Sequence, residues 1–317
     1  MTCKKLKNNI ILLLVIIYTF LTCSQTCKAG CSTEQIDFVK SKLEIRGYYI
    51  SKVIGKGKYG IAFLGRTSSS ELICFKCVFS KSFSNLEYEI FKIDDVQSCP
   101  NITKMLEKFE IEDDFIPMVV ITSEFNEGGS LLEKYKFFNE RPSEQDALQI
   151  ICDISNALQA IHKNGFIHRD IKADNIMTSN GRYKLIDFGL TIGIDSPKTK
   201  EGFAPYKSPE FLLFTTDGCD DYNEKVDIWA LGIMIYHLIT GKLPYVQRNS
   251  DMRLLSTKEL WENSKTFCLS LEDMPLFAPE YMTSLIVSCF AYNPDDRASA
   301  EFLHDSSCEL LRNFEEK

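Results

Sequence analysis

The feature that most restricts the fold of this chain is a change of sequence pattern at Gly128-Gly129. From Tyr48 up to these glycines, runs of β-branched and aromatic residues alternate with glycine and serine, which is typical of antiparallel strands joined by tight turns. A helix is expected near residues 86–96. The strands are expected at residues 48–50, 53–54, 61–64 and 72–79, around 111, and at 118–122.

Beyond these glycines the pattern becomes helical. Ser143, with Asp146 three residues later, forms a capping-type pair at a helix start. A second helix, expected from about 226 to 239, is apolar nearly all round and therefore deeply buried, and Gly241 ends it. A strand-rich half followed by a helix-rich half predicts an α+β, two-lobed architecture. The first helix carries apolar residues at helical spacing, namely Leu148, Ile151, Ile154, Leu158 and Ile161.

The composition is that of a globular chain. Of its 317 residues, 44% are hydrophobic and 25% are charged, which argues against disorder and allows a large core. The net charge of -8 disfavours nucleic acid as a partner, because binding to a phosphate backbone requires basic patches.

The first 30 residues differ from the rest of the chain. Lys4, Lys5 and Lys7 precede a mostly apolar run over residues 10–21, and small and polar residues follow. This order predicts a signal peptide within residues 1–30, and hence a chain that is secreted or resides in the secretory pathway. The run is short for a bilayer span, which needs about 20 apolar residues. A membrane anchor formed by this segment is the alternative.

Twelve cysteines suit an oxidising compartment, but their spacing does not define a site. Cys74 and Cys77 form a Cys-x-x-Cys pair within a predicted strand, and no second pair at ligand spacing accompanies them. Residues three apart on a strand point to opposite faces, so a disulfide between these two is not expected either. Most of the cysteines are interpreted as small core hydrophobes.

A glycine-rich string, with Gly55, Gly57 and Gly60 as its glycines and Lys56 between the first two, separates two predicted strands. A dinucleotide-binding turn would require a helix after the last glycine. Because strand residues follow instead, the string predicts a hairpin whose backbone N–H groups cover phosphates. An ordinary glycine turn is the alternative.

Lys76 lies inside an apolar strand, where an unpaired charge would be costly. A phosphate and a carboxylate partner would remove that cost. We predict Glu89, in the following helix, as the carboxylate partner, because Glu89 is better spaced than Glu87 from the segment 100–102, where the helix has ended.

The strongest chemical signal is the polar segment from His168 to Asn175, which is followed by Asp187-Phe188-Gly189. Phosphoryl transfer requires a carboxylate that accepts the proton of the attacking hydroxyl, and Asp170 suits this role. Lys172 can offset the charge that builds up on the transferred group. Asn175 and Asp187 provide oxygen ligands for Mg²⁺.

Together these motifs resemble the signatures of the eukaryotic protein kinase family. The resemblance covers residues 49–311, including Ser208-Pro209-Glu210 and the apolar helix that begins at Asp227. It implies that Arg297 pairs with Glu210. It also implies a kinase domain at residues 48–312, with a small β-rich lobe at 48–126 and a larger helical lobe at 127–312.

The resemblance further implies transfer of the γ-phosphate of ATP, with Mg²⁺, to protein hydroxyls by a monomer, and Lys172 matches the serine/threonine form. The alternative is a pseudokinase that acts as a binding module. Ser123 matches the gatekeeper, residues 124–126 match the hinge, and Ile93, Met105, His168 and Phe188 match the stacked column of the active state. The residues expected to bind ATP are Gly55, Lys56, Gly57, Gly60, Ala62, Cys74, Lys76, Ser123, Glu124, Asn126 and Met177.

Three further positions bear on regulation, peptide placement and glycosylation. Thr199 matches the family's activation site, where Arg169 would pair with a phosphate added by an upstream kinase or by autophosphorylation. Phe203 departs from the family's usual threonine and cannot form its hydrogen bond, which predicts altered peptide placement or a lowered rate. Asn101-Ile102-Thr103 is a glycosylation sequon, but in the family this position packs behind the upper lobe. The sequence therefore leaves open whether Asn101 is glycosylated or packed.

Overall fold

The computed structural model describes residues 33–57, 60–79, 87–112, 117–136, 138–202, 204–215, 221–243, 257–265 and 278–315. Its described residues form two compact units, one made of residues up to Tyr88 with Lys104–Phe125 and the other of Glu89–Thr103 with residues from Asn126 onward. A five-stranded antiparallel sheet followed by helices confirms the predicted α+β class. The predicted leader and Phe203 lie outside the described residues. Within the described ranges, no helix is both long and apolar enough to span a bilayer.

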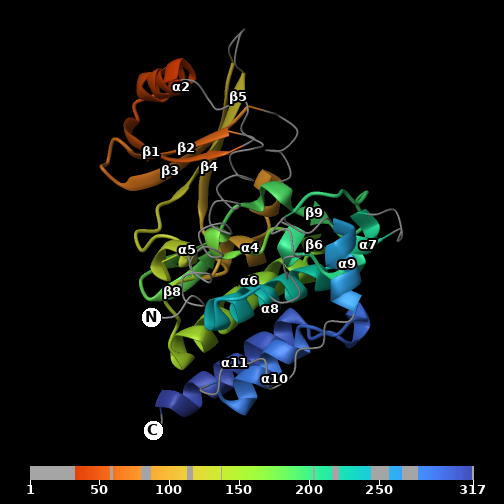
Figure 1. Ribbon diagram of the computed structural model, residues 1–317. Coiled ribbons are helices and arrows are strands. Elements are labelled where there is room, and N and C mark those ends of the chain that lie inside the picture. Colours follow the sequence, from red (N-terminus) through yellow and green to blue (C-terminus); the bar gives the residue numbers. More distant parts are fainter. Residues whose placement is uncertain are drawn as a thin grey trace, which may run out of the picture. The chain divides into compact units, whose positions relative to one another are not determined.

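The strand unit is built on one sheet with the order β1-β2-β3-β5-β4 (Figure 1). Along β2 and β3, every second residue is buried, so Phe63 and Phe75 lie on one face and Lys76 on the other. The strands are β1 (Tyr49–Gly57), β2 (Gly60–Arg66), β3 (Leu72–Val78), β4 (Met105–Ile111) and β5 (Met118–Glu124).

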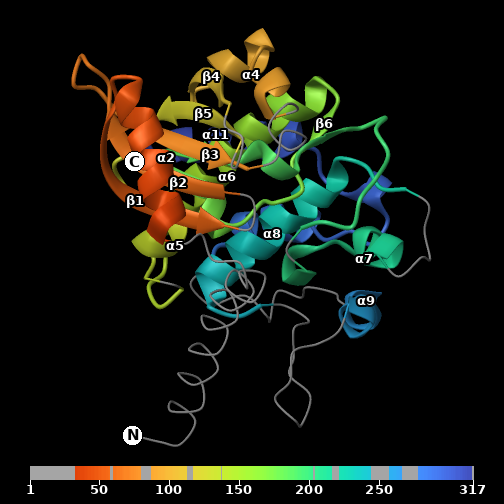
Figure 2. The same cartoon turned by 90° about the horizontal axis from the view of Figure 1, so that it is seen from above.

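The buried face of the sheet is covered by α2 (Thr33–Ile45), which crosses the strands in Figure 2. Val39 and Leu43 of this helix are fully buried, in one cluster with Phe63 and Phe75. The helix α2 was not predicted from the sequence, from which the domain was expected to begin at residue 48. The helix α2 completes the core of this unit, and it covers the face of the sheet opposite to Lys76.

The helical unit is centred on α6 (Glu144–Lys163) and α8 (Lys225–Thr240), whose predicted ends are confirmed. The backbone N–H of Asp146 donates to Ser143 Oγ at 3.1 Å, which caps α6. Gly241 ends α8 with φ of 70°, a conformation that side-chain-bearing residues adopt at a cost. The other helices are α4 (Asp94–Ser98), α5 (Leu131–Lys134), α7 (Pro209–Thr215), α9 (Thr257–Lys265), α10 (Glu280–Ser288) and α11 (Ala300–Glu315).

Two small antiparallel sheets of two strands each carry the chemical motifs of the helical unit. They are β6 (Phe166–Ile167) with β9 (Ile192–Gly193), and β7 (Ile176–Ser179) with β8 (Arg182–Leu185). The segment from His168 to Asn175 thus leaves β6 and enters β7, and Asp187 follows β8.

Residues 89–103 pack with the helical unit, although all of 48–126 was predicted to form one lobe. Asn101 explains part of this grouping. Its side-chain amide donates to the Tyr183 carbonyl at 3.0 Å and accepts from Asn156 at 2.8 Å, and only 1% of Asn101 is exposed. The Asn101 amide is therefore inaccessible in the folded chain. Of the two alternatives, a glycosylated Asn101 and a packed one, the structure supports the packed one.

His237 on α8 is a buried histidine that titrates far from its ordinary range. It is 4% exposed, and its ring stacks on Phe138 with the ring centres 3.6 Å apart. The Tyr206 hydroxyl lies 3.3 Å from Nδ1. Burial, with the nearby Arg141 charge acting in the same direction, lowers the pKa of His237 to about 3.

This lowered pKa predicts acid sensitivity. Unfolded His237 takes up a proton near pH 6.5, whereas the folded chain takes it up only near pH 3, so stability is lost as the pH falls between these values. Between pH 7 and pH 5, wild type is expected to lose about 2 kcal/mol more unfolding free energy than His237→Gln. Urea unfolding at both pH values measures this. Equal acid losses in the two proteins would contradict it.

Candidate active site

The glycine-rich string forms the turn region of the β1–β2 hairpin. Gly55 pairs with Ala62, and Gly57 pairs with Gly60. The strand that follows the string confirms the predicted hairpin and excludes a dinucleotide-binding turn, which needs a helix there. A Cβ atom on Gly60 would lie 1.8 Å from the Cys77 carbonyl oxygen, so the close approach of β2 to β3 admits only glycine.

Ala62, Cys74 and Lys76 lie on the same face of the sheet. Ala62 is opposite Lys76, and Cys74 is opposite Ser123. Burial raises the pKa of the Cys74 thiol to about 11, although a hydrogen bond with Ser123 acts in the opposite direction. Cys74 therefore stays protonated and offers a small, uncharged surface, as expected of a wall for an adenine ring.

Lys76 pairs with Glu87, and not with Glu89 as predicted. Lys76 Nζ lies 2.8 and 2.9 Å from the two Glu87 carboxylate oxygens, and the Glu87 side chain is only 6% exposed. Glu89 instead pairs with Lys92 at 2.7 Å, in an ion pair whose side chains are both more than half exposed. Residues two apart on a helix point in different directions, so only one of the two glutamates can face the lysine.

The predicted stacked column is wrong by the same two residues, since Phe91 takes the place predicted for Ile93. Phe91, four residues after Glu87, packs edge-on against Phe188 at 4.9 Å between ring centres. Phe188 also packs edge-on against His168 at 5.0 Å. Ile93, which was predicted for the position of Phe91, is the N-cap of α4. The prediction was wrong because the phase of the helix was taken from its distance to residues 100–102.

The two glutamates provide a direct test. Glu87→Gln is expected to lower kcat of phosphoryl transfer about 100-fold, because the neutral amide cannot hold the Lys76 ammonium in place. Glu89→Gln is the matched control and is expected to change kcat less than about threefold, since exposed ion pairs contribute little. Steady-state kinetics with saturating Mg-ATP measures both. A larger loss in Glu89→Gln than in Glu87→Gln would contradict the assignment.

The predicted hinge begins where β5 ends. The Glu124 backbone N–H donates to the Lys104 carbonyl at 3.0 Å, and its carboxylate accepts from the Lys104 N–H at 2.9 Å, which fixes the end of β5 to the residue that precedes β4. In the helical unit, Asn126 donates to Thr103 Oγ1 at 3.0 Å, and Met177 lies on β7. The residues predicted to bind ATP are thus divided between the two units.

The backbone next to Asp170 is fixed by a buried carboxylate on α8, that of Asp227. Asp227 accepts from the backbone N–H groups of His168 and Arg169, both at 2.8 Å, and its carboxylate lies 2.9 Å from His162 Nε2. Burial alone would raise the pKa of Asp227, but its hydrogen bonds and the charge of His162 outweigh burial and hold the pKa below the ordinary value. Asp227 therefore stays ionised and fixes the loop backbone.

Asp170 is the centre of a small polar cluster. Lys172 Nζ lies 2.7 Å from Asp170 Oδ2, and the Asn175 amide donates to the same oxygen and to the Asp170 carbonyl, both at 2.8 Å. Burial would lower the pKa of Lys172, but the charge of Asp170 outweighs this and raises it. The cluster therefore places a fixed cation beside a carboxylate that is 8% exposed.

The predicted Mg²⁺ ligands, Asn175 and Asp187, both carry side-chain oxygen atoms. The Asn175 amide nitrogen donates to Asp170 twice, so the amide oxygen is the atom that suits a cation. Asp187 has φ of 61° and is exposed, and its Oδ1 accepts from the Gly189 N–H at 3.2 Å. Two oxygen donors of this kind suit a hard divalent cation. The residues present therefore fit Mg²⁺, and their role stays a prediction.

Comparison with known proteins identifies the family. The protein kinase domain model matches residues 48–307. The chain belongs to the protein kinase family.

Among its relatives, this protein kinase is 30% identical to an Aurora kinase of Eremothecium gossypii over 80% of the chain and 67% of the relative. It is 31% identical to the serine/threonine-protein kinase ppk11 of Schizosaccharomyces pombe over 82% of the chain and 81% of the relative. It is also 30% identical to the probable serine/threonine-protein kinase 2 of Plasmodium falciparum, over 80% of the chain but 48% of the relative. Members of the family generally use ATP and Mg²⁺.

In this protein kinase, Thr199 is held by two side chains. The Arg169 guanidinium contacts Thr199 Oγ1 and donates to the Leu190 carbonyl through Nε at 2.6 Å. Tyr222 donates from its hydroxyl to the Thr199 carbonyl at 2.9 Å and accepts from Arg169 at 3.1 Å. The role of Arg169 was predicted from the sequence. That of Tyr222 was not, because this residue lies in the loop before α8 and no local pattern indicates its contact.

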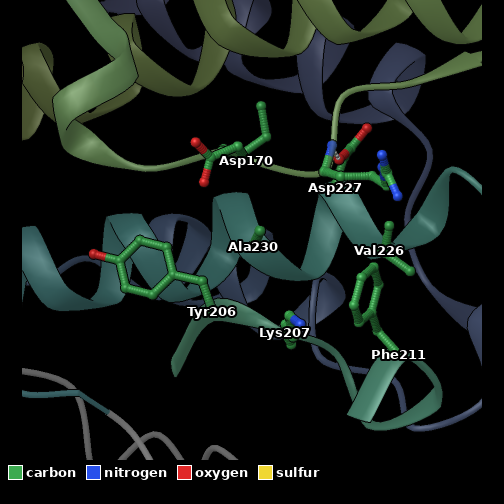
Figure 3. A pocket seen from close by; sticks show the side chains of 9 residues that line it. Asp170, Tyr206, Lys207, Phe211, Val226, Asp227 and Ala230 are labelled. Carbon is green, nitrogen blue, oxygen red and sulfur yellow. Dashed lines mark hydrogen bonds between the residues drawn. The ribbon is translucent and has the colours of Figure 1, made fainter. Parts of the chain in front are cut away.

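A pocket of the helical unit lies beside Asp170 (Figure 3). Lys207 lines it, donates to the Lys200 carbonyl at 2.7 Å, and lies 4.4 Å from the centre of the Phe211 ring. Burial lowers the pKa of Lys207 to about 8, although the Glu201 carboxylate acts in the opposite direction. The other lining residues are Arg169, Ile171, Tyr206, Val226, Asp227 and Ala230.

Proposed function

We propose that this protein kinase is active and transfers the γ-phosphate of ATP to serine and threonine hydroxyls of proteins. The observation that carries the proposal is the cluster of Asp170, Lys172 and Asn175, joined by contacts of 2.7 to 2.8 Å. The similarity to kinases named as serine/threonine-protein kinases supports the hydroxyl specificity.

Each unit contributes a separate part of the chemistry. In the strand unit, the β1–β2 hairpin and Lys76 bind the nucleotide phosphates, and Glu87 fixes the lysine. In the helical unit, Asp170 accepts the proton of the attacking hydroxyl, and Lys172 stabilises negative charge on the transferred group. Asn175 and Asp187 would hold Mg²⁺, which would supply neutralisation of phosphate charge.

The protein substrate is proposed to contact the pocket beside Asp170. Its lining combines side chains of both charges, including Arg169, Lys207 and Asp170, with apolar ones such as Tyr206 and Phe211. A lining of this mixed kind suits a peptide segment with an apolar side chain near the acceptor hydroxyl. This proposal names a chemical class of peptide and no individual protein.

The proposed activity is tested with the purified full chain, Mg-ATP and a peptide library that contains serine, threonine or tyrosine as the only acceptor. Transfer to serine and threonine peptides, abolished when a chelator removes Mg²⁺, is the expected result. Binding of ATP without transfer to any peptide would show a pseudokinase instead. Transfer to tyrosine alone would overturn the predicted acceptor.

Phosphorylation of Thr199 is proposed to raise activity, because a phosphate there would form a charge-assisted contact with Arg169 in place of the hydroxyl contact. Thr199→Ala is expected to lower activity about 10-fold after preincubation with ATP. Ser196→Ala, in the same segment, is the control and should retain wild-type activity. Mass spectrometry that finds no phosphate on Thr199 in fully active protein would contradict this proposal.

We also propose that residues 1–30 direct the chain into the secretory pathway. A basic flank and an apolar run of signal-peptide length support this, and an anchored chain is the alternative. N-terminal sequencing of the protein recovered from expressing cells distinguishes the two. A mature N-terminus beyond the apolar run supports cleavage, whereas an intact N-terminus in membrane fractions supports the anchor.

A further inference from the structure

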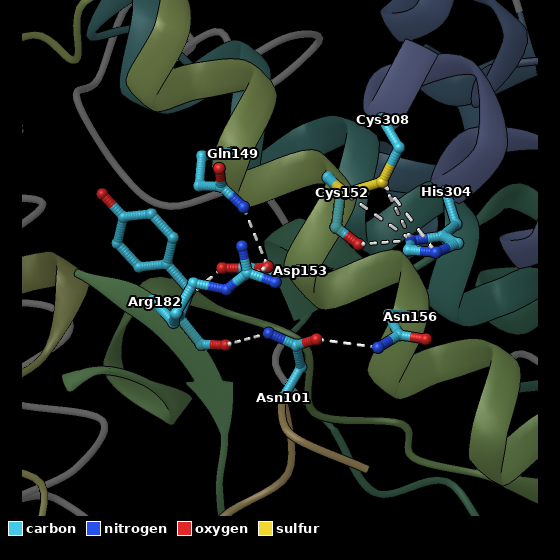
Figure 4. Close-up of polar contacts among 9 residues, drawn as sticks. Asn101, Gln149, Cys152, Asp153, Asn156, Arg182, His304 and Cys308 are labelled. Carbon is cyan, nitrogen blue, oxygen red and sulfur yellow. Dashed lines mark hydrogen bonds and ion pairs between the residues drawn. A yellow bond between two sulfur atoms is a disulfide. The ribbon is translucent and has the colours of Figure 1, made fainter. Parts of the chain in front are cut away.

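One cluster of the helical unit lies apart from the phosphoryl-transfer residues. Cys152 on α6 meets His304 and Cys308 on α11 (Figure 4). Cys152 and Cys308, 156 positions apart, are joined by a disulfide. His304 and Cys308 are four residues apart on one helix, so their side chains share a face. Every ligand atom of this group lies within 4.8 Å of the others.

The orientation of His304 is not required by a disulfide. Its Nδ1 lies 3.6 Å from both sulfur atoms and 3.0 Å from the Cys152 carbonyl oxygen, whereas Nε2 lies 3.9 Å from Cys308 Sγ. On one tetrahedral ion with metal–sulfur and metal–nitrogen bonds of about 2.3 and 2.0 Å, a sulfur and a nitrogen ligand lie about 3.6 Å apart. Nδ1 of His304 therefore lies at the separation from both sulfur atoms that a shared ion requires.

We propose that the reduced form of this cluster binds a divalent ion of the Zn²⁺ class through Cys152 Sγ, Cys308 Sγ and His304 Nδ1. Two thiolates and an imidazole are ligands that Zn²⁺ prefers, in tetrahedral geometry. With metal–sulfur bonds of about 2.3 Å, two sulfur atoms on one tetrahedral ion lie about 3.7 Å apart, so opening the disulfide provides the separation that the ion needs. Solvent takes the fourth position.

Metal binding and the disulfide exclude each other because both use the same two sulfur atoms. Two equivalents of a thiol, RSH, reduce the disulfide to two cysteine thiols and are themselves oxidised to RSSR. The ion then binds with release of the two thiol protons and keeps its oxidation state. Oxidation by RSSR returns the disulfide, two RSH and the free ion once these two protons are restored. The cluster thus joins α6 to α11 covalently in one state and through a metal in the other.

The test uses the full chain, reduced with a phosphine, desalted without oxygen and titrated with Co²⁺ as the probe. The expected result is a thiolate-to-cobalt charge-transfer band and tetrahedral d–d bands that saturate at one equivalent and vanish when Zn²⁺ is added. The oxidised chain should give neither band. This readout does not depend on kinase activity, so it stands or fails separately from the proposed function.

Three variants complete the experiment. Cys308→Ser should lose most of the charge-transfer intensity and bind Co²⁺ more than about 100-fold more weakly, and His304→Gln should weaken binding by at least about 10-fold. Cys99→Ser removes a buried cysteine outside the cluster and should bind like wild type. The proposal is overturned if reduced wild type gives no bands or if Cys308→Ser retains them. It is also overturned if reduction abolishes the circular dichroism of the fold, because the ligands must be held by folded α6 and α11.

Discussion

Asp170→Asn is expected to lower kcat of phosphoryl transfer by about 10²- to 10⁴-fold, the usual contribution of a positioned general base. The carboxylate is the only group in the Asp170 cluster that can accept a proton, since Lys172 and the Asn175 amide both donate to it. An asparagine side chain cannot accept the hydroxyl proton and would also lose its charge attraction to Lys172. Steady-state kinetics with a serine peptide measures the loss.

The nucleotide should still bind to Asp170→Asn, because the predicted phosphate contacts come from Lys76 and the glycine-rich hairpin. A binding titration with ATP should therefore give a Kd within about threefold of wild type. Asp305→Asn, which removes an exposed aspartate on α11, is the matched control and should retain both activity and binding. Retention of wild-type kcat by Asp170→Asn would remove the proposed base from the mechanism.

Arg297→Met is expected to cost about 3–5 kcal/mol of unfolding free energy, the usual result of breaking a buried ion pair by removing one partner. The Arg297 side chain is fully buried, and its guanidinium donates to the two Glu210 carboxylate oxygens at 2.7 and 3.1 Å. It also donates to the Ala291 and Lys225 carbonyls at 3.0 and 2.8 Å. This pair confirms the predicted contact between Arg297 and Glu210.

Two controls separate the ion pair from a general effect of removing arginine. Arg312→Met, at an exposed site on α11, is expected to change stability by less than about 0.5 kcal/mol. The double variant Glu210→Leu with Arg297→Met should recover part of the loss, because no unpaired buried carboxylate is left. Urea unfolding measures all three variants. A loss below about 1 kcal/mol in Arg297→Met would contradict the buried pair.

The order of the elements could be predicted from the sequence because it depends on local chemistry. Ser143 caps α6 through a contact within three residues, and Gly241 ends α8 through its own backbone conformation. Alternation on β2 and β3 likewise follows from neighbouring residues. The motif residues from His168 to Asn175 were found in the same way, because the chemistry they suit needs closely spaced side chains.

The partner of Lys76 could not be predicted from local chemistry. Glu87 and Glu89 have the same side chain on the same short helix, and the direction each one faces depends on how that helix packs. Only the structure distinguishes the ion pair at 2.8 Å from the exposed one with Lys92. The helix α2 was missed for a different reason. Its apolar spacing at Ile36, Val39 and Leu43 is a detectable signal, but most of this short segment is polar.

The pairing of the cysteines could not be predicted from the sequence. Their number allowed many pairings, and the spacing of Cys74 and Cys77 indicated neither a disulfide nor a metal site. The α+β class, the kinase motifs, the start of α6 and the end of α8 could be predicted because each depends on residues close together along the chain. The contacts of Glu87 with Lys76, of Tyr222 with Thr199 and of Cys152 with Cys308 could not be predicted, because they depend on packing between segments that are distant or differently oriented.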